Sequence, residues 1–182
     1  MQSRSAAATA AGSRAEWRSL VAEPISRLSP APQRTWQYGE MGRASGGSLW
    51  PHQTHQNGLS ADFFMPVVNE GGVPQKLPIS FLNKFGYGLE FDRRGKLDDW
   101  TIDWKAVADH LLALRDAAHA HGVRVQRIII TPVFHERLFQ VAPEVRRLAP
   151  LFMKKEAWVR HDEHYHVDLE IPARFRRPLI CK

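Results

Sequence analysis

The chain of 182 residues and 20.8 kDa is long enough for one domain with its own core, but too short for two full domains and a linker. Hydrophobic residues make up 43% and charged residues 24%, and the mean hydropathy is −0.38, which excludes a fibrous or wholly disordered chain and predicts a soluble globular protein. The formal net charge of +6 favours an anionic partner, without choosing among nucleic acid, anionic lipid and an acidic cell-wall polymer.

The N-terminal segment, residues 1–15, is rich in Ala, Ser and Gly and predicts a mobile tail, so we expect a single domain over residues 16–182. This segment lacks the apolar region of a signal peptide, and nowhere does the chain approach the roughly 20 apolar residues that a membrane span needs. We therefore expect no membrane span and no visible export signal.

Residues 59–64 alternate in the manner of a half-buried strand and follow an Asn-Gly turn signal at residues 57–58. The alternation places Asp62 on the face opposite Leu59 and Phe63. Residues 66–78 are rich in Gly and Pro and predict a loop long enough to form one wall of a cleft; an aromatic stretch follows it, ending near Phe91.

Apolar residues at three- and four-residue spacing predict a helix over residues 104–118, with Asp103 or Thr101 as its N-cap and Gly122 at its end. Residues 123–130 predict a strand, residues 131–140 a second helix and residues 158–171 a last strand. Strands interleaved with helices of unequal length, without a repeat or a βαβ series, predict an α+β fold.

Five of the nine histidines lie in two short clusters, which is the first feature that points to chemistry. They are His52, His55, His161, His164 and His166. Residues two apart on a strand share a face, so His164 and His166 point the same way while Tyr165 faces the core. The first cluster adds Asp62, seven positions after a histidine and across a glycine turn that can fold the chain back.

Two histidines and one aspartate suit Zn²⁺ and leave a fourth position for a water whose pKa falls to about 7, so the pattern points to metal-assisted hydrolysis. The single Cys181 excludes a disulfide framework and a Cys-rich zinc site. Each feature alone is weak, because H-x-H pairs and solvated aspartates are common without a metal. The two clusters together carry the hypothesis.

The two clusters resemble the penicillin-insensitive murein endopeptidase family, a branch of the LAS group of zinc peptidases (lysostaphin, D-Ala-D-Ala metallopeptidases, sonic hedgehog). The resemblance lies in residues 52–62, H-x-x-H-Q-N-G-L-x-A-D, and residues 158–167, W-x-R-H-D-E-H-Y-H-V, and residues 125–132 fit the family's strand before its second helix. It covers about residues 36–172 and implies a small central antiparallel sheet flanked by helices, the LAS-type zinc peptidase fold.

Carried onto this sequence, the resemblance implies that one zinc ion per chain is held by His55, Asp62 and His166. It makes His164 a non-ligand histidine that acts on the water or the oxyanion and His161 a further catalytic histidine. It places His52 either behind the metal ligands or in the substrate cleft. Strand alternation places His161 opposite His164, so it reaches the metal only if the strand begins later or bulges. The same alternation turns Glu163 away from the pair and ranks it low as a base.

The implied function is a zinc metallopeptidase, a peptidoglycan D,D-endopeptidase that hydrolyses the D-Ala–meso-diaminopimelate crosslink between stem peptides, acting in the periplasm or cell wall. Residues 66–78 and 81–91 are candidate walls of its groove. Two alternatives stay open: a D-Ala-D-Ala carboxypeptidase, with Arg43 or Arg160 as the cation for the substrate carboxylate, and a non-catalytic zinc-containing cell-wall binding module. Nucleic acid is not an expected partner, because no nucleic-acid-binding motif is recognisable.

Overall fold

The computed structural model describes residues 36–41, 55, 59–157 and 159–170. The expectations for the tail at residues 1–15, the turn at residues 57–58 and the role of His52 lie outside these residues, as do Arg43 and Trp158.

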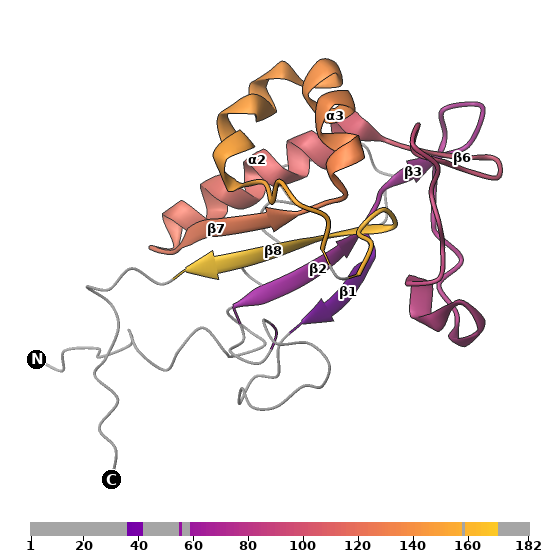
Figure 1. Ribbon diagram of the computed structural model, residues 1–182, viewed down its shortest axis with the longest axis horizontal. Coiled ribbons are helices and arrows are strands. Elements are labelled where there is room, and N and C mark those ends of the chain that lie inside the picture. The colour runs from indigo at the N-terminus through magenta and orange to yellow at the C-terminus, as the bar shows by residue number, and fades with distance from the viewer. Residues whose placement is uncertain (1–35, 42–54, 56–58, 158, 171–182) are drawn as a thin grey trace, which may run out of the picture.

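The main sheet has four antiparallel strands in the order β1-β2-β8-β7 (Figure 1). They are β1 (Tyr38–Met41), β2 (Ser60–Phe64), β7 (Arg124–Ile129) and β8 (His164–Glu170). The predicted α+β class and the small antiparallel sheet are confirmed. The half-buried character expected of residues 59–64 is wrong: all five residues of β2 are buried, so both faces of this strand are covered.

A second small antiparallel sheet, of order β4-β3-β6-β5, lies beside the first (Figure 1). Its strands are β3 (Val67–Val68), β4 (Pro74–Gln75), β5 (Lys96–Leu97) and β6 (Trp100–Ile102). The prediction of one continuous loop over residues 66–78 is therefore wrong. Strands of two residues are too short to show alternation, and the Asn69 side chain closes the turn between them by accepting from the Val73 amide at 2.9 Å.

The long helix α2 (Trp104–Ala120) begins where its cap predicts, because the Asp103 carboxylate accepts from the Ala106 amide at 3.0 Å. Beyond its end, Gly122 has φ of +75°, the left-handed conformation that glycine adopts without strain. The helix predicted over residues 131–140 is divided into the 3₁₀ turn η3 (Pro132–Phe134) and α3 (His135–Val141). The described residues also include the 3₁₀ segments η2 (Phe81–Gly86) and η4 (Pro143–Leu151).

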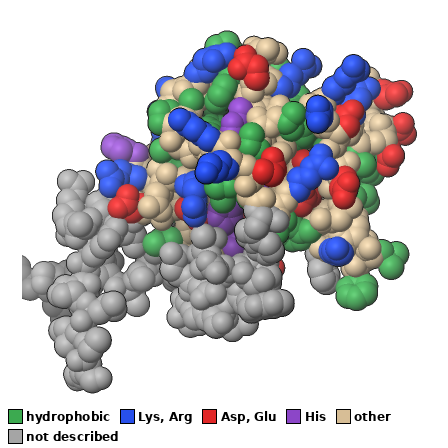
Figure 2. Space-filling view, viewed as in Figure 1, with side chains coloured by type: hydrophobic (Ala, Val, Ile, Leu, Met, Phe, Trp, Pro, Cys, Tyr) green, Lys and Arg blue, Asp and Glu red, His purple; other side chains and the backbone are tan. Residues whose placement is uncertain are grey.

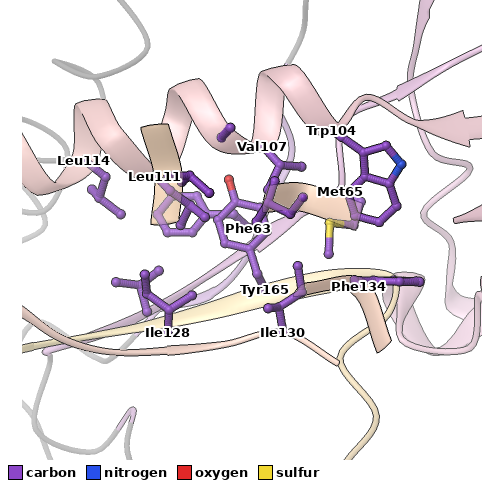
Figure 3. Close-up of a cluster of buried hydrophobic side chains, with 14 of the residues drawn as sticks. Phe63, Met65, Trp104, Val107, Leu111, Leu114, Ile128, Ile130, Phe134 and Tyr165 are labelled. Carbon is purple, nitrogen blue, oxygen red and sulfur yellow. The ribbon is translucent and has the colours of Figure 1, made fainter. Parts of the chain in front are cut away.

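The core lies between α2 and one face of the main sheet (Figure 3). Val107, Leu111 and Leu114 of α2 are buried here, and Phe63 and Tyr165 point at them from the two inner strands. Because side chains alternate along a strand, the residues between these aromatic ones project from the other face of the sheet. That face carries Asp62, His164 and His166, and α2 lies on the opposite side of the sheet.

No helix within the described residues has the length and apolar character needed to cross a bilayer.

The core also contains one buried polar pair. The Tyr165 hydroxyl and the His110 Nδ1 are 2.6 Å apart, and burial lowers the pKa of His110 to about 3, which keeps the imidazole neutral. We expect Tyr165→Phe to lower the free energy of unfolding by about 1–3 kcal/mol, because it leaves a buried imidazole nitrogen without this partner. Urea denaturation measures the loss. The double variant with His110→Phe should lose less than the two single variants together, and a Tyr165→Phe protein of unchanged stability would contradict this account of the pair.

Candidate metal centre

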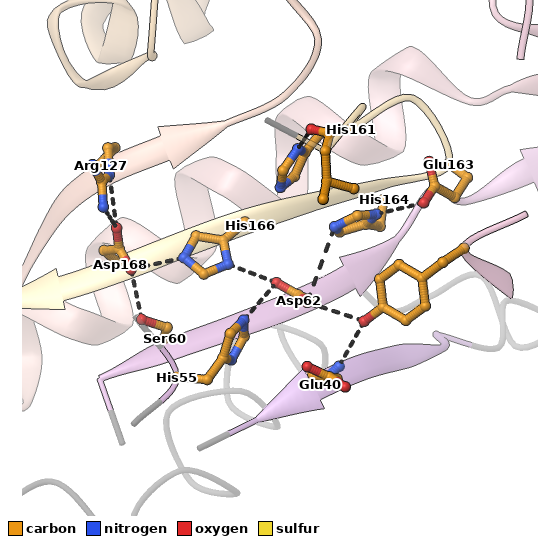
Figure 4. A network of polar contacts seen from close by, with 12 residues as sticks. Glu40, His55, Ser60, Asp62, Arg127, His161, Glu163, His164, His166 and Asp168 are labelled. Atoms are coloured by element: carbon orange, nitrogen blue, oxygen red, sulfur yellow. Dashed lines mark hydrogen bonds and ion pairs between the residues drawn. The ribbon is translucent and has the colours of Figure 1, made fainter. Parts of the chain in front are cut away.

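Three potential metal ligands converge on the polar face of the main sheet: His55, Asp62 and His166 (Figure 4). Asp62 lies on β2 directly opposite His166 on β8, so strand register alone brings these two together. The Asp62 Oδ1 is 2.7 Å from the His166 Nδ1 and 3.3 Å from the His55 Nε2. All three side chains are buried, and one ligand atom from each lies within 4.8 Å of the others.

This donor set fits zinc. Imidazole nitrogen and carboxylate oxygen are ordinary zinc ligands, and donor atoms about 2.0 Å from a tetrahedral ion lie about 3.3 Å from one another. Burial alone would raise the pKa of Asp62, but hydrogen bonds from His166 and His55, and the nearby His164, hold it well below its usual range. The carboxylate is therefore ionised, as a metal ligand must be.

Tyr87 contacts the second carboxylate oxygen of Asp62, and the sequence did not suggest this contact. Its hydroxyl donates to the Asp62 Oδ2 at 3.0 Å, which leaves Oδ1 to face the two histidines. Burial and the Asp62 charge raise the pKa of Tyr87, so the phenol keeps its proton. A Cβ on Gly39 would lie 2.9 Å from the Tyr87 oxygen and 2.8 Å from the Asp62 Cβ, so the missing side chain on β1 makes room for this contact.

His164 lies beside the triad and is held by Glu163. The His164 Nε2 is 4.0 Å from the Asp62 Oδ2, while its Nδ1 is 2.9 Å from the Glu163 Oε1. The expectation that strand alternation turns Glu163 away from the histidines is wrong, because Glu163 precedes the strand and alternation does not apply to it. Burial raises the pKa of Glu163 to about 7 and lowers that of His164 to about 4.

His161 also reaches this group, because β8 begins at His164 rather than at residue 158. Its ring centroid is 4.5 Å from that of His164 and 6.3 Å from that of His166. Its Nδ1 donates to the Val159 carbonyl at 2.7 Å, so Nε2 carries the lone pair. Burial, followed by the proximity of His164, lowers the pKa of His161 to about 4.

Arg160 and Asp162 anchor the aromatic stretch beside the site. Arg160 donates to the Phe91 carbonyl at 2.7 Å, and the Phe91 amide donates to Asp162 at 2.7 Å. The same stretch places Tyr87 edge-on to His164, with 4.9 Å between ring centroids. The part of residues 81–91 that contains Tyr87 therefore borders the site, whereas residues 66–78 form part of the second sheet.

Histidine side chains are visible near the centre of the face shown in Figure 2, with Lys and Arg side chains above and to the left of them. Of the residues that the sequence pointed to, the structure brings together His55, Asp62, His161, His164 and His166. An imidazole next to a group of potential metal ligands can accept and return a proton, or donate a hydrogen bond to a developing negative charge. Hydrolytic active sites use groups of this kind.

Comparison with known proteins points the same way. A family model described as penicillin-insensitive murein endopeptidase matches residues 21–177. A protein of Haemophilus influenzae named penicillin-insensitive murein endopeptidase is 29% identical over 149 residues, which are 81% of this chain and 47% of the relative. The chain therefore spans about half the length of this curated relative.

Proposed function

Since the chain belongs to the penicillin-insensitive murein endopeptidase family, we propose that it is a zinc-dependent peptidoglycan hydrolase that cleaves the D-Ala–meso-diaminopimelate crosslink between stem peptides. The observation that carries the proposal is the convergence of His55, Asp62 and His166 on the polar face of the sheet. Its site of action would be the periplasm or cell wall, where this substrate lies.

The proposed ligands are the His55 Nε2, the Asp62 Oδ1 and the His166 Nδ1, the atoms that approach one another most closely. When bound, zinc supplies Lewis acidity, which lowers the pKa of a water to about 7 and polarises a carbonyl group. The two neighbouring imidazoles, His161 and His164, are proposed as the catalytic groups.

His164 is placed for proton transfer. Glu163 fixes the ring through Nδ1, so Nε2 is turned toward Asp62 and the ligand cluster. Burial favours the neutral imidazole near neutral pH, so Nε2 can take a proton and later deliver it to the leaving amine. In its protonated state the same nitrogen can donate to the negative charge that develops on the substrate carbonyl oxygen. His161, whose ring centroid is 4.5 Å from that of His164, is proposed to assist in the same step.

The structure weakens the case for a D-Ala-D-Ala carboxypeptidase in one respect. That activity calls for a cation to bind the terminal carboxylate of the substrate. Of the two arginines considered for it, Arg43 lies outside the described residues, and Arg160 already contacts the Phe91 carbonyl and Asp162, whose Oδ1 is 3.3 Å from the Arg160 Nε. A non-catalytic binding module would have no use for His161 and His164, the two non-ligand histidines beside the three proposed ligands.

The proposal is tested by digestion of purified muropeptides. The full chain loaded with zinc should convert crosslinked dimers to monomers, and a chelator should abolish the conversion until zinc is added back. Monomeric pentapeptide should keep its terminal D-Ala. Product masses identify the cleaved bond. Release of free D-Ala from monomers with dimers left intact would favour the carboxypeptidase instead, and tight zinc binding without any cleavage would favour the binding module.

A further inference from the structure

His166 lies between two carboxylates, and only one of them belongs to the proposed ligand set (Figure 4). Its Nδ1 is 2.7 Å from the Asp62 Oδ1, while its Nε2 is 2.7 Å from the Asp168 Oδ1. Asp168 is two residues further along β8 and therefore shares the face of His166. Its buried carboxylate does not approach His166 by chance, because side chains from two other strands fix it.

The two strands that pair with β8 hold Asp168 from opposite sides. In the register of the sheet, Ser60 on β2 and Arg127 on β7 both lie opposite Asp168. The Ser60 hydroxyl donates to Oδ1 at 2.6 Å, and the Arg127 Nε and a terminal guanidinium nitrogen approach Oδ2 at 2.7 and 2.6 Å. The carboxylate thus has little freedom to turn away from the imidazole.

We propose that Asp168 is a positioning residue for the metal centre: in the zinc-loaded protein it accepts the Nε2 proton of His166, so that Nδ1 gives up the proton it donates to Asp62 and can act as a ligand. This role rests on the proposed function. A histidine bound to a metal through one nitrogen commonly donates its other N–H to a carboxylate, which fixes the tautomer and the ring orientation. Ser60 and Arg127 complete the arrangement, because they hold the carboxylate in place.

A purely structural role for Asp168, as the partner of Arg127, makes a different prediction. In that case its loss would lower the stability of the fold without changing the zinc affinity of the folded protein. The same strand pair offers a matched control, since Arg124 on β7 and Glu170 on β8 form an ion pair at 3.0 Å whose two partners are not ligands of the proposed centre.

The experiment measures the zinc affinity of the folded full chain by competition with a chromophoric chelator at fixed pH. Asp168→Ala should weaken zinc binding by about 10- to 100-fold, the usual effect of losing such an outer partner. Asp168→Asn should retain most of the affinity, because its amide oxygen can still accept the Nε2 proton. Glu170→Gln should match the wild type. Far-UV circular dichroism and urea denaturation in excess chelator confirm that the compared proteins are folded.

A folded Asp168→Ala protein that binds zinc as tightly as the wild type would contradict the positioning role and leave the proposed function standing. A wild-type protein that binds no zinc would contradict both. If Asp168→Ala does not fold, long-range ¹H–¹⁵N correlation spectra of the zinc-loaded wild type decide the matter. We expect His166 to carry its proton on Nε2, and a proton on Nδ1 would overturn the proposal.

Discussion

Replacement of His166 by alanine should leave the purified protein without stoichiometric zinc and without hydrolytic activity. This imidazole is one of the three donors of the proposed centre, and it is the one that lies between Asp62 and Asp168. Its removal leaves only His55 and Asp62 of the three proposed ligands. We expect the loss of zinc affinity to exceed the roughly 10- to 100-fold effect of removing an outer partner.

The measurement is metal analysis after dialysis against a weak chelator, with the zinc-to-protein ratio as the readout. His55→Ala and Asp62→Asn should behave like His166→Ala. His119→Ala is the matched control, because it removes an exposed imidazole at the end of α2, on an element that contributes no ligand to the proposed centre. Undiminished zinc in His166→Ala would show that the metal is held elsewhere.

His164→Ala should keep its zinc and lose most of its activity. The His164 Nε2 lies 4.0 Å from the Asp62 Oδ2, so the ring is near the proposed ligands. Its Nδ1 contacts Glu163, which is not one of them. A positioned acid, base or oxyanion donor contributes about 10² to 10⁴-fold to a rate, and the turnover of crosslinked dimers should fall by a factor in that range.

The zinc content and the turnover rate must be read together in this variant. Zinc lost along with activity would mean that the ligand and catalytic roles of His164 and His166 had been exchanged. Full activity would reduce His164 to a packing residue. Tyr165→Phe serves as the control on the same strand, since it alters the residue between the two histidines on the opposite face of the sheet.

The sequence predicted the parts of the site that depend on strand alternation. Asp62 and His166 each follow from a period of two, and the spacing of the apolar residues predicted α2 together with its Asp103 cap. The same rule, applied two residues further, would have found Asp168. It failed for Glu163 and His161 because the strand begins only at His164, and the period of two has no meaning before that residue.

The contact between Tyr87 and Asp62 could not be read from the sequence. The two residues are 25 positions apart, and what joins them is the path of a 3₁₀ segment whose turns are tied by the Asn83 side chain to the Ser80 and Gly86 amides, both at 2.9 Å. Neither periodicity nor composition predicts such a path. The second sheet was not predicted for a related reason: its strands of two or three residues are too short to show a periodic pattern.

The most direct test of the account is diffraction from crystals of the zinc-loaded full chain, recorded at the zinc absorption edge. The account predicts a single anomalous peak enclosed by the His55 Nε2, the Asp62 Oδ1 and the His166 Nδ1, with the Asp168 carboxylate on the far side of the His166 ring. A peak bound by His164 in place of His166, or no peak among these three side chains, would contradict it.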